Sequence, residues 1–122
     1  MKKVMQDKFG DEGNCTEACI ASILEIPLDE VPYLVPYGEK WMDALHPFLI
    51  DRGLYLITVD AETFLKIKKP YGYSIGGGRS PRVTGFDHSV VCLDGEIVHD
   101  PHSGSDPIEI TEFGLFVSTM RE

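Results

Sequence analysis

In the first half of the chain, apolar and small residues recur every three or four positions, the spacing of one face of an α-helix. The clearest stripe follows Asn14, a favourable N-cap residue, and Glu17 stands three positions later to complete a capping box. In a second stripe Leu45 and Leu49 form the buried side, while Pro47 predicts a kink or a division into two short helices. The predicted helices span residues 15–26, 40–52 and 60–68, the last with Asp60 or Ala61 near its cap.

The second half of the chain is rich in β-branched and aromatic residues, in short runs that turn residues separate. The glycine-rich stretch 76–81 predicts a mobile loop. Because helices precede most of the strands, we predict one α+β domain over residues 1–122, with N-terminal helices packed on a C-terminal antiparallel sheet. The predicted strands span residues 54–59, 71–75, 87–93, 96–99 and 115–119.

The strongest hairpin signal joins the third and fourth of these strands, and its register decides whether His88 and Asp100 can meet. A two-residue loop, Asp94-Gly95, leaves the two side chains on opposite faces if the strands are regular. A three-residue loop that begins at Leu93 places them directly opposite each other. Both turns suit the sequence, and only the second supports contact between the two residues.

Charge and composition narrow the classes of partner. The chain of 122 residues has a formal net charge of −9. Its only cluster of basic residues is Lys66, Lys68 and Lys69, which we expect on a solvated face. We therefore expect no nucleic acid and no membrane surface as partner. No apolar run approaches the roughly 20 residues of a membrane span, and no signal peptide is evident. Three cysteines, an odd number, favour reduced thiols and a cytoplasmic location.

Cys15 falls near the first position of the first predicted helix, where unpaired N–H groups and the helix dipole favour a thiolate. His88 is a possible base for this thiol, and Asp100 is a possible group to orient the imidazole. The backbone N–H of Cys15 and the side chain of Gln6 are candidate donors to an oxyanion. The other two thiols, Cys19 and Cys92, fall on an apolar helix face and in a strand, and we expect them in the core.

Metal binding is the competing interpretation of the same histidines. His99, Asp100 and His102, together with His88 and Cys15, contain metal-ligating groups. In a regular strand, however, His99 and Asp100 point to opposite faces, and no Cys-x-x-Cys or His-x-x-x-His spacing occurs. We therefore predict neither a metal site nor a cofactor.

A glutamine upstream of Gly13-Asn14-Cys15 at a helix start, followed by His and Asp in a C-terminal sheet, resembles the papain-like cysteine peptidase fold. The resemblance is closest to small bacterial and phage proteins related to bacteriocin-processing peptidases. It implies that Gln6 serves the oxyanion hole, Cys15 is the nucleophile, His88 the base and Asp100 the orienting residue.

The function that we predict is therefore that of a thiol hydrolase. It would cleave an amide, peptide or isopeptide bond through a thioester intermediate, with a peptide or small amide as substrate. The alternative is a non-catalytic interaction or inhibitor protein of the same fold, of phage origin. The sequence leaves peptidase, amidase and acyltransferase chemistry open.

Overall fold

The computed structural model describes residues 1–67, 72–82, 85–104 and 108–119. In these residues one antiparallel sheet has the strand order β1-β5-β2-β3-β4. The strands are β1 (Leu54–Asp60), β2 (Tyr73–Arg79), β3 (Asp87–Leu93), β4 (Glu96–His99) and β5 (Ile110–Ser118). The helices are α1 (Cys15–Leu24), α2 (Trp41–Ile50) and α3 (Ala61–Phe64), with 3-10 turns η1 (Gly10–Glu12), η2 (Leu28–Glu30) and η3 (Val35–Lys40). The chain is thus α+β, as the sequence predicts.

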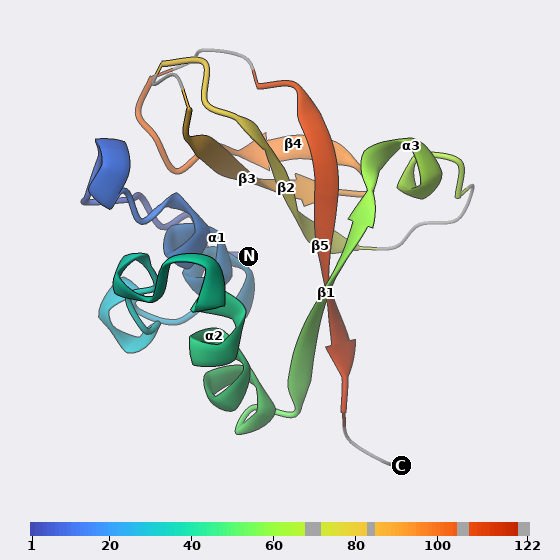
Figure 1. The fold of residues 1–122 in the computed structure, drawn as a ribbon. Coiled ribbons are helices and arrows are strands. Elements are labelled where there is room, and N and C mark those ends of the chain that lie inside the picture. The colour runs from blue at the N-terminus through green and yellow to red at the C-terminus, as the bar shows by residue number, and fades with distance from the viewer. Residues whose placement is uncertain (68–71, 83–84, 105–107, 120–122) are drawn as a thin grey trace.

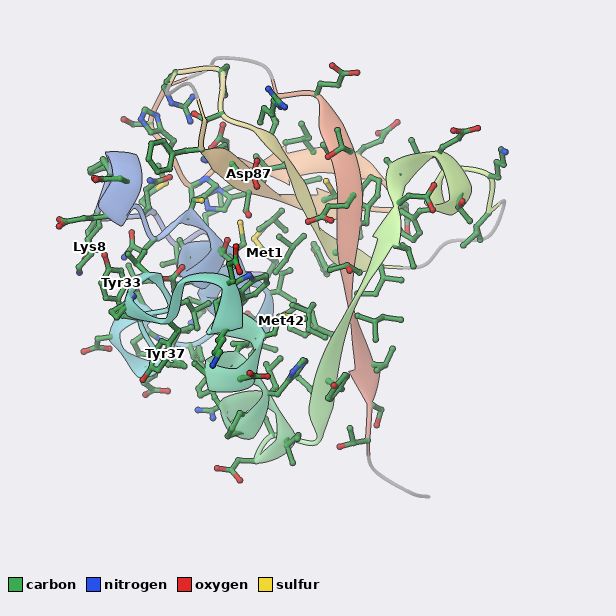
Figure 2. The ribbon with its side chains drawn as sticks, in the orientation of Figure 1. Met1, Lys8, Tyr33, Tyr37, Met42 and Asp87 are labelled. Atoms are coloured by element: carbon green, nitrogen blue, oxygen red, sulfur yellow. The ribbon has the colours of Figure 1, made fainter. Side chains whose placement is uncertain are left out.

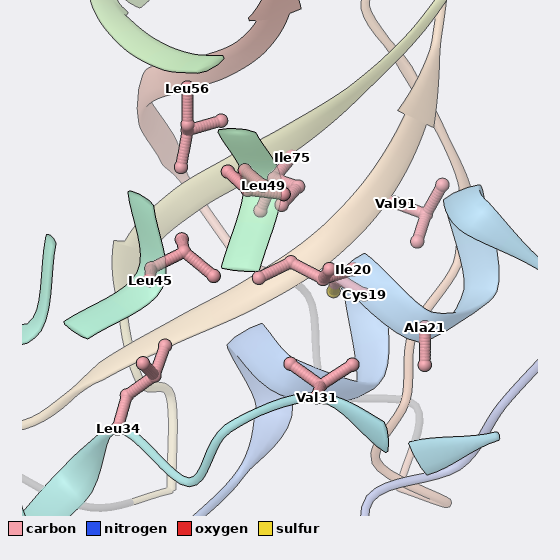
Figure 3. Close-up of a cluster of buried hydrophobic side chains, with 10 residues drawn as sticks. All are labelled: Cys19, Ile20, Ala21, Val31, Leu34, Leu45, Leu49, Leu56, Ile75 and Val91. Atoms are coloured by element: carbon pink, nitrogen blue, oxygen red, sulfur yellow. The ribbon is translucent and has the colours of Figure 1, made fainter. Parts of the chain in front are cut away.

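Helices cover both faces of the sheet. Figure 1 shows α1 and α2 together on one side and α3 on the other. Under α1 and α2 lies the larger core, in which Cys19, Leu45 and Leu49 are fully buried and Ile75 and Val91 come from the sheet (Figure 3). The smaller core, between α3 and the opposite face, contains Ala61, Phe64, Val90, Cys92 and Phe113. The burial of Leu45, Leu49, Cys19 and Cys92 confirms their prediction as core residues.

The first helix begins at the predicted residue but is capped differently. The Asn14 side chain makes no hydrogen bond to the helix, so the predicted capping box is wrong. The carboxylate of Glu17 instead accepts a hydrogen bond from the backbone N–H of Leu34 (3.2 Å), because burial of this acid requires a partner. The helix ends at Leu24, before the predicted residue 26, since Glu25 adopts a left-handed conformation (φ 57°).

The other two helices are shorter than predicted. The α2 helix continues through Pro47, so neither a division nor a second helix is found there. The α3 helix has Asp60 as its N-cap, whose carboxylate accepts from the N–H of Thr63 (2.9 Å), as predicted. Its predicted end at residue 68 lies outside the described residues, as do Lys68 and Lys69, whereas Lys66 is exposed as expected. In the described part of the chain, no helix is both long and apolar enough to cross a membrane.

The glycine-rich stretch is a strand rather than the predicted loop. Gly76, Gly77 and Gly78 lie in β2, between β5 and β3. A Cβ on Gly76 would approach Ile110 Cδ1 to 2.7 Å, and a Cβ on Gly78 would collide with the backbone carbonyl of Glu109. Close neighbours, not flexibility, therefore account for glycine at positions 76 and 78. The predicted bounds of β3 and β4 are confirmed, while β5 begins at Ile110 rather than at residue 115, and residue 71 of the predicted second strand is outside the described ranges.

The β3–β4 hairpin has the two-residue loop, so the three-residue alternative is wrong. Asp94 and Gly95 both have positive φ (51° and 85°), and Leu93 pairs with Glu96. This is the geometry of a type I′ turn, which matches the twist of the strands.

The predicted consequence of that loop is nevertheless reversed by a bulge. The register shifts by one between residues 97 and 99, which leaves Val98 as an extra residue in β4. One inserted residue moves every later side chain to the opposite face. Asp100 therefore lies on the same face as His88, and the two meet despite the shorter loop.

Candidate active site

Cys15 is the first residue of α1 and is half-buried against the start of β3. The hydroxyl groups of Thr16 and Ser89 share a hydrogen bond of 2.9 Å, which joins the first turn of the helix to the strand. The backbone and hydroxyl of Ser89 are also polar neighbours of the Cys15 sulfur. The thiol is thus held beside the residue that follows His88 in the chain.

The electrostatics of this thiol differ from the sequence-based expectation. Burial raises the pKa of the Cys15 thiol above its ordinary value, and the carboxylate of Glu17 raises it further. Hydrogen-bonding groups of Ser89 and Thr16 lower the pKa, but by less. Burial thus opposes the thiolate that a helix terminus favours, and the neutral thiol is the favoured form at neutral pH. Burial raises the pKa of the other thiols too, to about 11 for Cys92 and well above its ordinary value for Cys19.

His88 and Asp100 form the short hydrogen bond on which the site depends. The imidazole Nε2 lies 2.7 Å from Asp100 Oδ1, and the His88 ring is buried. The same carboxylate oxygen accepts from the backbone N–H of His102 at 2.9 Å, which holds the carboxylate in place. A carboxylate accepts only from a protonated nitrogen, so the neutral ring carries its hydrogen on Nε2. The other nitrogen, Nδ1, is then a base with no partner among the described residues.

The pKa of His88 lies below its ordinary value, chiefly because burial disfavours the imidazolium. The hydrogen bond and charge of Asp100 oppose this shift, while Arg82 and His102 add to it. At neutral pH the pair is therefore a neutral thiol and a neutral imidazole. Such a pair suits general-base activation of the thiol rather than a preformed ion pair.

Gln6 is brought to the site by the segment that precedes α1. Its backbone N–H donates to the carbonyl of Pro101 (3.0 Å), next to Asp100 in the chain. Its side chain is buried, and Nε2 donates one hydrogen to the carbonyl of Lys8 (2.9 Å). An amide nitrogen carries two hydrogens, so one remains for another acceptor.

The charged stretch between Gln6 and the helix is folded back by Asn14. The side-chain oxygen of Asn14 accepts from the N–H groups of Asp7 (3.1 Å) and Lys8 (3.0 Å), and its Nδ2 donates to the Asp7 carboxylate (2.7 Å). These bonds close a loop around the turn η1. Because the chain folds back here, Gln6 and Cys15 line the same cleft although several residues separate them in the sequence. Outside the loop, the Lys8 ammonium lies 5.2 Å from the centre of the Tyr33 ring (Figure 2).

A cleft of about 160 Å³ brings the predicted residues together. Gln6, Cys15 and His88 all line it, together with His102. Asp100 does not line this cleft; it contacts His88 from behind. The four residues predicted from the sequence thus belong to one site. We call the cleft that Gln6, Cys15 and His88 line the reaction cleft.

The competing interpretation of the histidines was a metal site. In residues 1–67, 72–82, 85–104 and 108–119, no three or more potential ligands are grouped closely enough to hold an ion. His99 is instead used structurally: its Nε2 lies 2.8 Å from the carbonyl of Val4 and fixes the N-terminal segment against β4.

Three polar residues of the site were not predicted. Asn14 was expected to cap a helix, whereas it closes the loop that positions Gln6. Ser89 directly follows the predicted His88, which was its only signal, and His102 was considered only as a potential metal ligand. The ring of His102 lies edge-on to His88, with 6.3 Å between centroids, and its Nδ1 accepts from Gly104 N–H (2.8 Å).

Comparison with known proteins adds no relative: no family model, curated protein or solved structure matches this chain.

Proposed function

We propose that the protein is a papain-like thiol hydrolase that cleaves an amide, peptide or isopeptide bond. The observation that carries the proposal is the 2.7 Å bond between His88 Nε2 and Asp100, in a cleft that Cys15 and Gln6 also line. Here the nitrogen left as a base belongs to a buried ring in the cleft of a helix-terminal thiol.

Each residue has a distinct task in the proposed reaction. His88 Nδ1 takes the thiol proton as Cys15 Sγ attacks the carbonyl carbon, and the imidazolium then protonates the leaving nitrogen. Asp100 stabilises the imidazolium and fixes its tautomer. The Cys15 N–H and the second hydrogen of Gln6 Nε2 donate to the oxyanion. Water, deprotonated by His88, hydrolyses the thioester and returns Cys15 to the thiol.

An activated ester tests this proposal without knowledge of the natural substrate. With p-nitrophenyl acetate, Cys15 should form a thioester as p-nitrophenolate leaves, and the acetyl group should then pass to water. Intact-mass and peptide-mapping spectrometry should locate one transient acetyl group on Cys15, absent in Cys15→Ala. Acetylation confined to lysines, or a Cys15 thioester that never turns over, would contradict the proposal.

The second candidate, a non-catalytic interaction or inhibitor protein of the same fold, is favoured by the raised pKa of Cys15. A thiol that stays protonated is a poor nucleophile unless a base acts on it. The ester experiment separates the two candidates, because a binding protein has no turnover.

A further inference from the structure

A second, larger cleft of about 310 Å³ adjoins the reaction cleft and shares His88 and Asp87 with it. Asp87 lies at the start of β3, near the helical layer in Figure 2. We call this space the acidic cleft; its defining residues are Trp41, Leu56, Ile75, Gly77, Asp87 and Glu112.

The floor of the acidic cleft exists because one residue lacks a side chain. Glu112, Gly77 and Ser89 are directly opposite one another on β5, β2 and β3, so their side-chain positions share one face. Gly77 places no side chain at the middle position, and the Glu112 side chain extends over it, with Oε1 at 3.6 Å from where a Cβ would lie. A Cβ there would lie 3.5 Å from Glu112 Cγ, an ordinary contact, so nothing in the packing forbids a side chain. The gap runs from Ser89, beside Cys15, to the carboxylate of Glu112.

The Glu112 carboxylate is within reach of a substrate side chain. Neighbouring strands are about 4.8 Å apart, and this carboxylate lies over Gly77, one strand spacing from Ser89. A side chain of a substrate held at Cys15 would meet the carboxylate after crossing this one spacing.

The lining of the acidic cleft combines an apolar floor with negatively charged side chains. Leu56 and Ile75 are buried and apolar, and Trp41 adds an aromatic surface. Asp87 and Glu112 are its two carboxylates, and neither forms a salt bridge with a described residue. Arg79 pairs across the strands with Asp87 but does not line the cleft.

We propose that the acidic cleft selects a lysine or arginine side chain within two residues of the bond that is cleaved. The aliphatic stem would pack on Leu56 and Ile75, while the cation would meet Glu112 and Asp87 beside the face of Trp41. The net charge of −9 would attract such substrates at long range. This inference rests on the proposed function and specifies its substrate class.

Cleavage-site profiling tests the selection directly. A library of synthetic peptides is incubated with the protein, and the new termini are identified by mass spectrometry. Lysine and arginine should be enriched at least ten-fold over glutamate and norleucine within two residues of the cut. Glu112→Gln should remove most of this enrichment, and Gly77→Val should remove it by filling the cleft. Glu109→Gln, the same charge change at an exposed residue outside the cleft, should leave it intact.

Binding gives a readout independent of turnover. Trp41 is the only tryptophan of the chain, so intrinsic fluorescence reports on the acidic cleft. In the inactive Cys15→Ala variant, acetylated hexapeptides with one central lysine should shift this fluorescence at concentrations at least ten-fold lower than matched norleucine or glutamate peptides. The difference should disappear in Cys15→Ala with Glu112→Gln.

The two experiments separate the inference from the proposed function. Cleavage without basic enrichment would overturn the inference and leave the hydrolase intact. Lysine-selective binding without any cleavage would uphold the acidic cleft as a cation site and overturn the hydrolase. Equal binding of the three peptides would overturn the inference whatever the turnover.

Discussion

Helix α1 contributes one thiol to each of two regions that differ in exposure and in neighbouring groups. Cys15, its first residue, lines the reaction cleft beside hydroxyl groups and a histidine. Cys19, one turn later, is fully buried in the core formed with α2. The same helix thus packs in the core along its length and, under the proposed function, supplies the nucleophile at its end. Because the regions are separated by one turn, substitutions can test the chemistry and the core one at a time.

The largest expected effect is the loss of turnover when the nucleophile is removed. Cys15→Ala should reduce turnover of p-nitrophenyl acetate by about 10³-fold or more, since the remaining site has no covalent route. Its melting temperature should stay within a few degrees of the wild type, as for a change of about 1 kcal/mol in free energy of unfolding. The matched Cys19→Ala should retain turnover. Ester kinetics and thermal melts check both variants; a Cys15→Ala protein that fails to fold would make this thiol structural.

The orienting role of Asp100 predicts the next effect. Asp100→Asn should lower kcat/KM by about 10²- to 10⁴-fold, because the imidazolium loses its counter-charge. In the wild type the acidic limb of kcat/KM should lie below pH 6.5, since burial depresses the pKa of His88 and only the neutral ring accepts the thiol proton.

The direction of a further pH shift follows from the same hydrogen bond. Asp100 raises the pKa of His88, so its removal should move the acidic limb to still lower pH. His99→Gln is the control, because His99 is a buried histidine of the same hairpin whose Nε2 bonds to the carbonyl of Val4. This variant should leave the acidic limb in place. A limb shifted upward in Asp100→Asn would contradict the assigned pair.

Substitutions in the core between α2 and the sheet should lower stability. Leu49→Ala should cost about 2–5 kcal/mol in free energy of unfolding, because the side chain is fully buried between α2 and the sheet. The neighbouring Ile50→Ala should cost less than about 1 kcal/mol, since Ile50 is 52 % exposed. Urea unfolding measures both, and equal costs would contradict the described packing of α2.

Two adjacent glycines of β2 give the smallest stability contrast. Gly78→Ala should destabilise by about 1–3 kcal/mol, because its Cβ meets the rigid backbone of Glu109. Gly77→Ala should be tolerated, because its Cβ reaches only ordinary contact distance from Glu112. Urea unfolding of the two variants checks the order, and an equal or larger cost for Gly77→Ala would contradict the described packing of β2.

The sequence predicted those features that local pattern decides. The bounds of β3 and β4 followed from the short strand-forming runs on either side of Asp94-Gly95, and Cys15 was placed correctly at a helix start. Tertiary neighbours decided the rest. Glu17 accepts from the N–H of Leu34 instead of forming the predicted capping box. The close neighbours of Gly76 and Gly78 were not visible in the sequence.

The candidate site shows the same division. Its four residues were predicted from chemistry and resemblance, yet the contact between His88 and Asp100 arises through a bulge at Val98 that no turn signal announces. The burial that raises the pKa of Cys15 could not be predicted from the sequence, because it depends on the whole fold. The loop clamped by Asn14 likewise depends on residues that fold back on each other.

The central claim is that His88 acts as a base on Cys15, and the alkylation rate of this one thiol tests it most directly. Iodoacetamide labelling of the folded protein at pH 7, followed by peptide mapping, gives the rate for each cysteine. We expect Cys15 to react faster than Cys19 or Cys92, and His88→Gln to slow Cys15 by about ten-fold or more without changing Cys92. An unchanged Cys15 rate in His88→Gln, with reactivity that appears only as the thiol itself ionises at alkaline pH, would contradict the account.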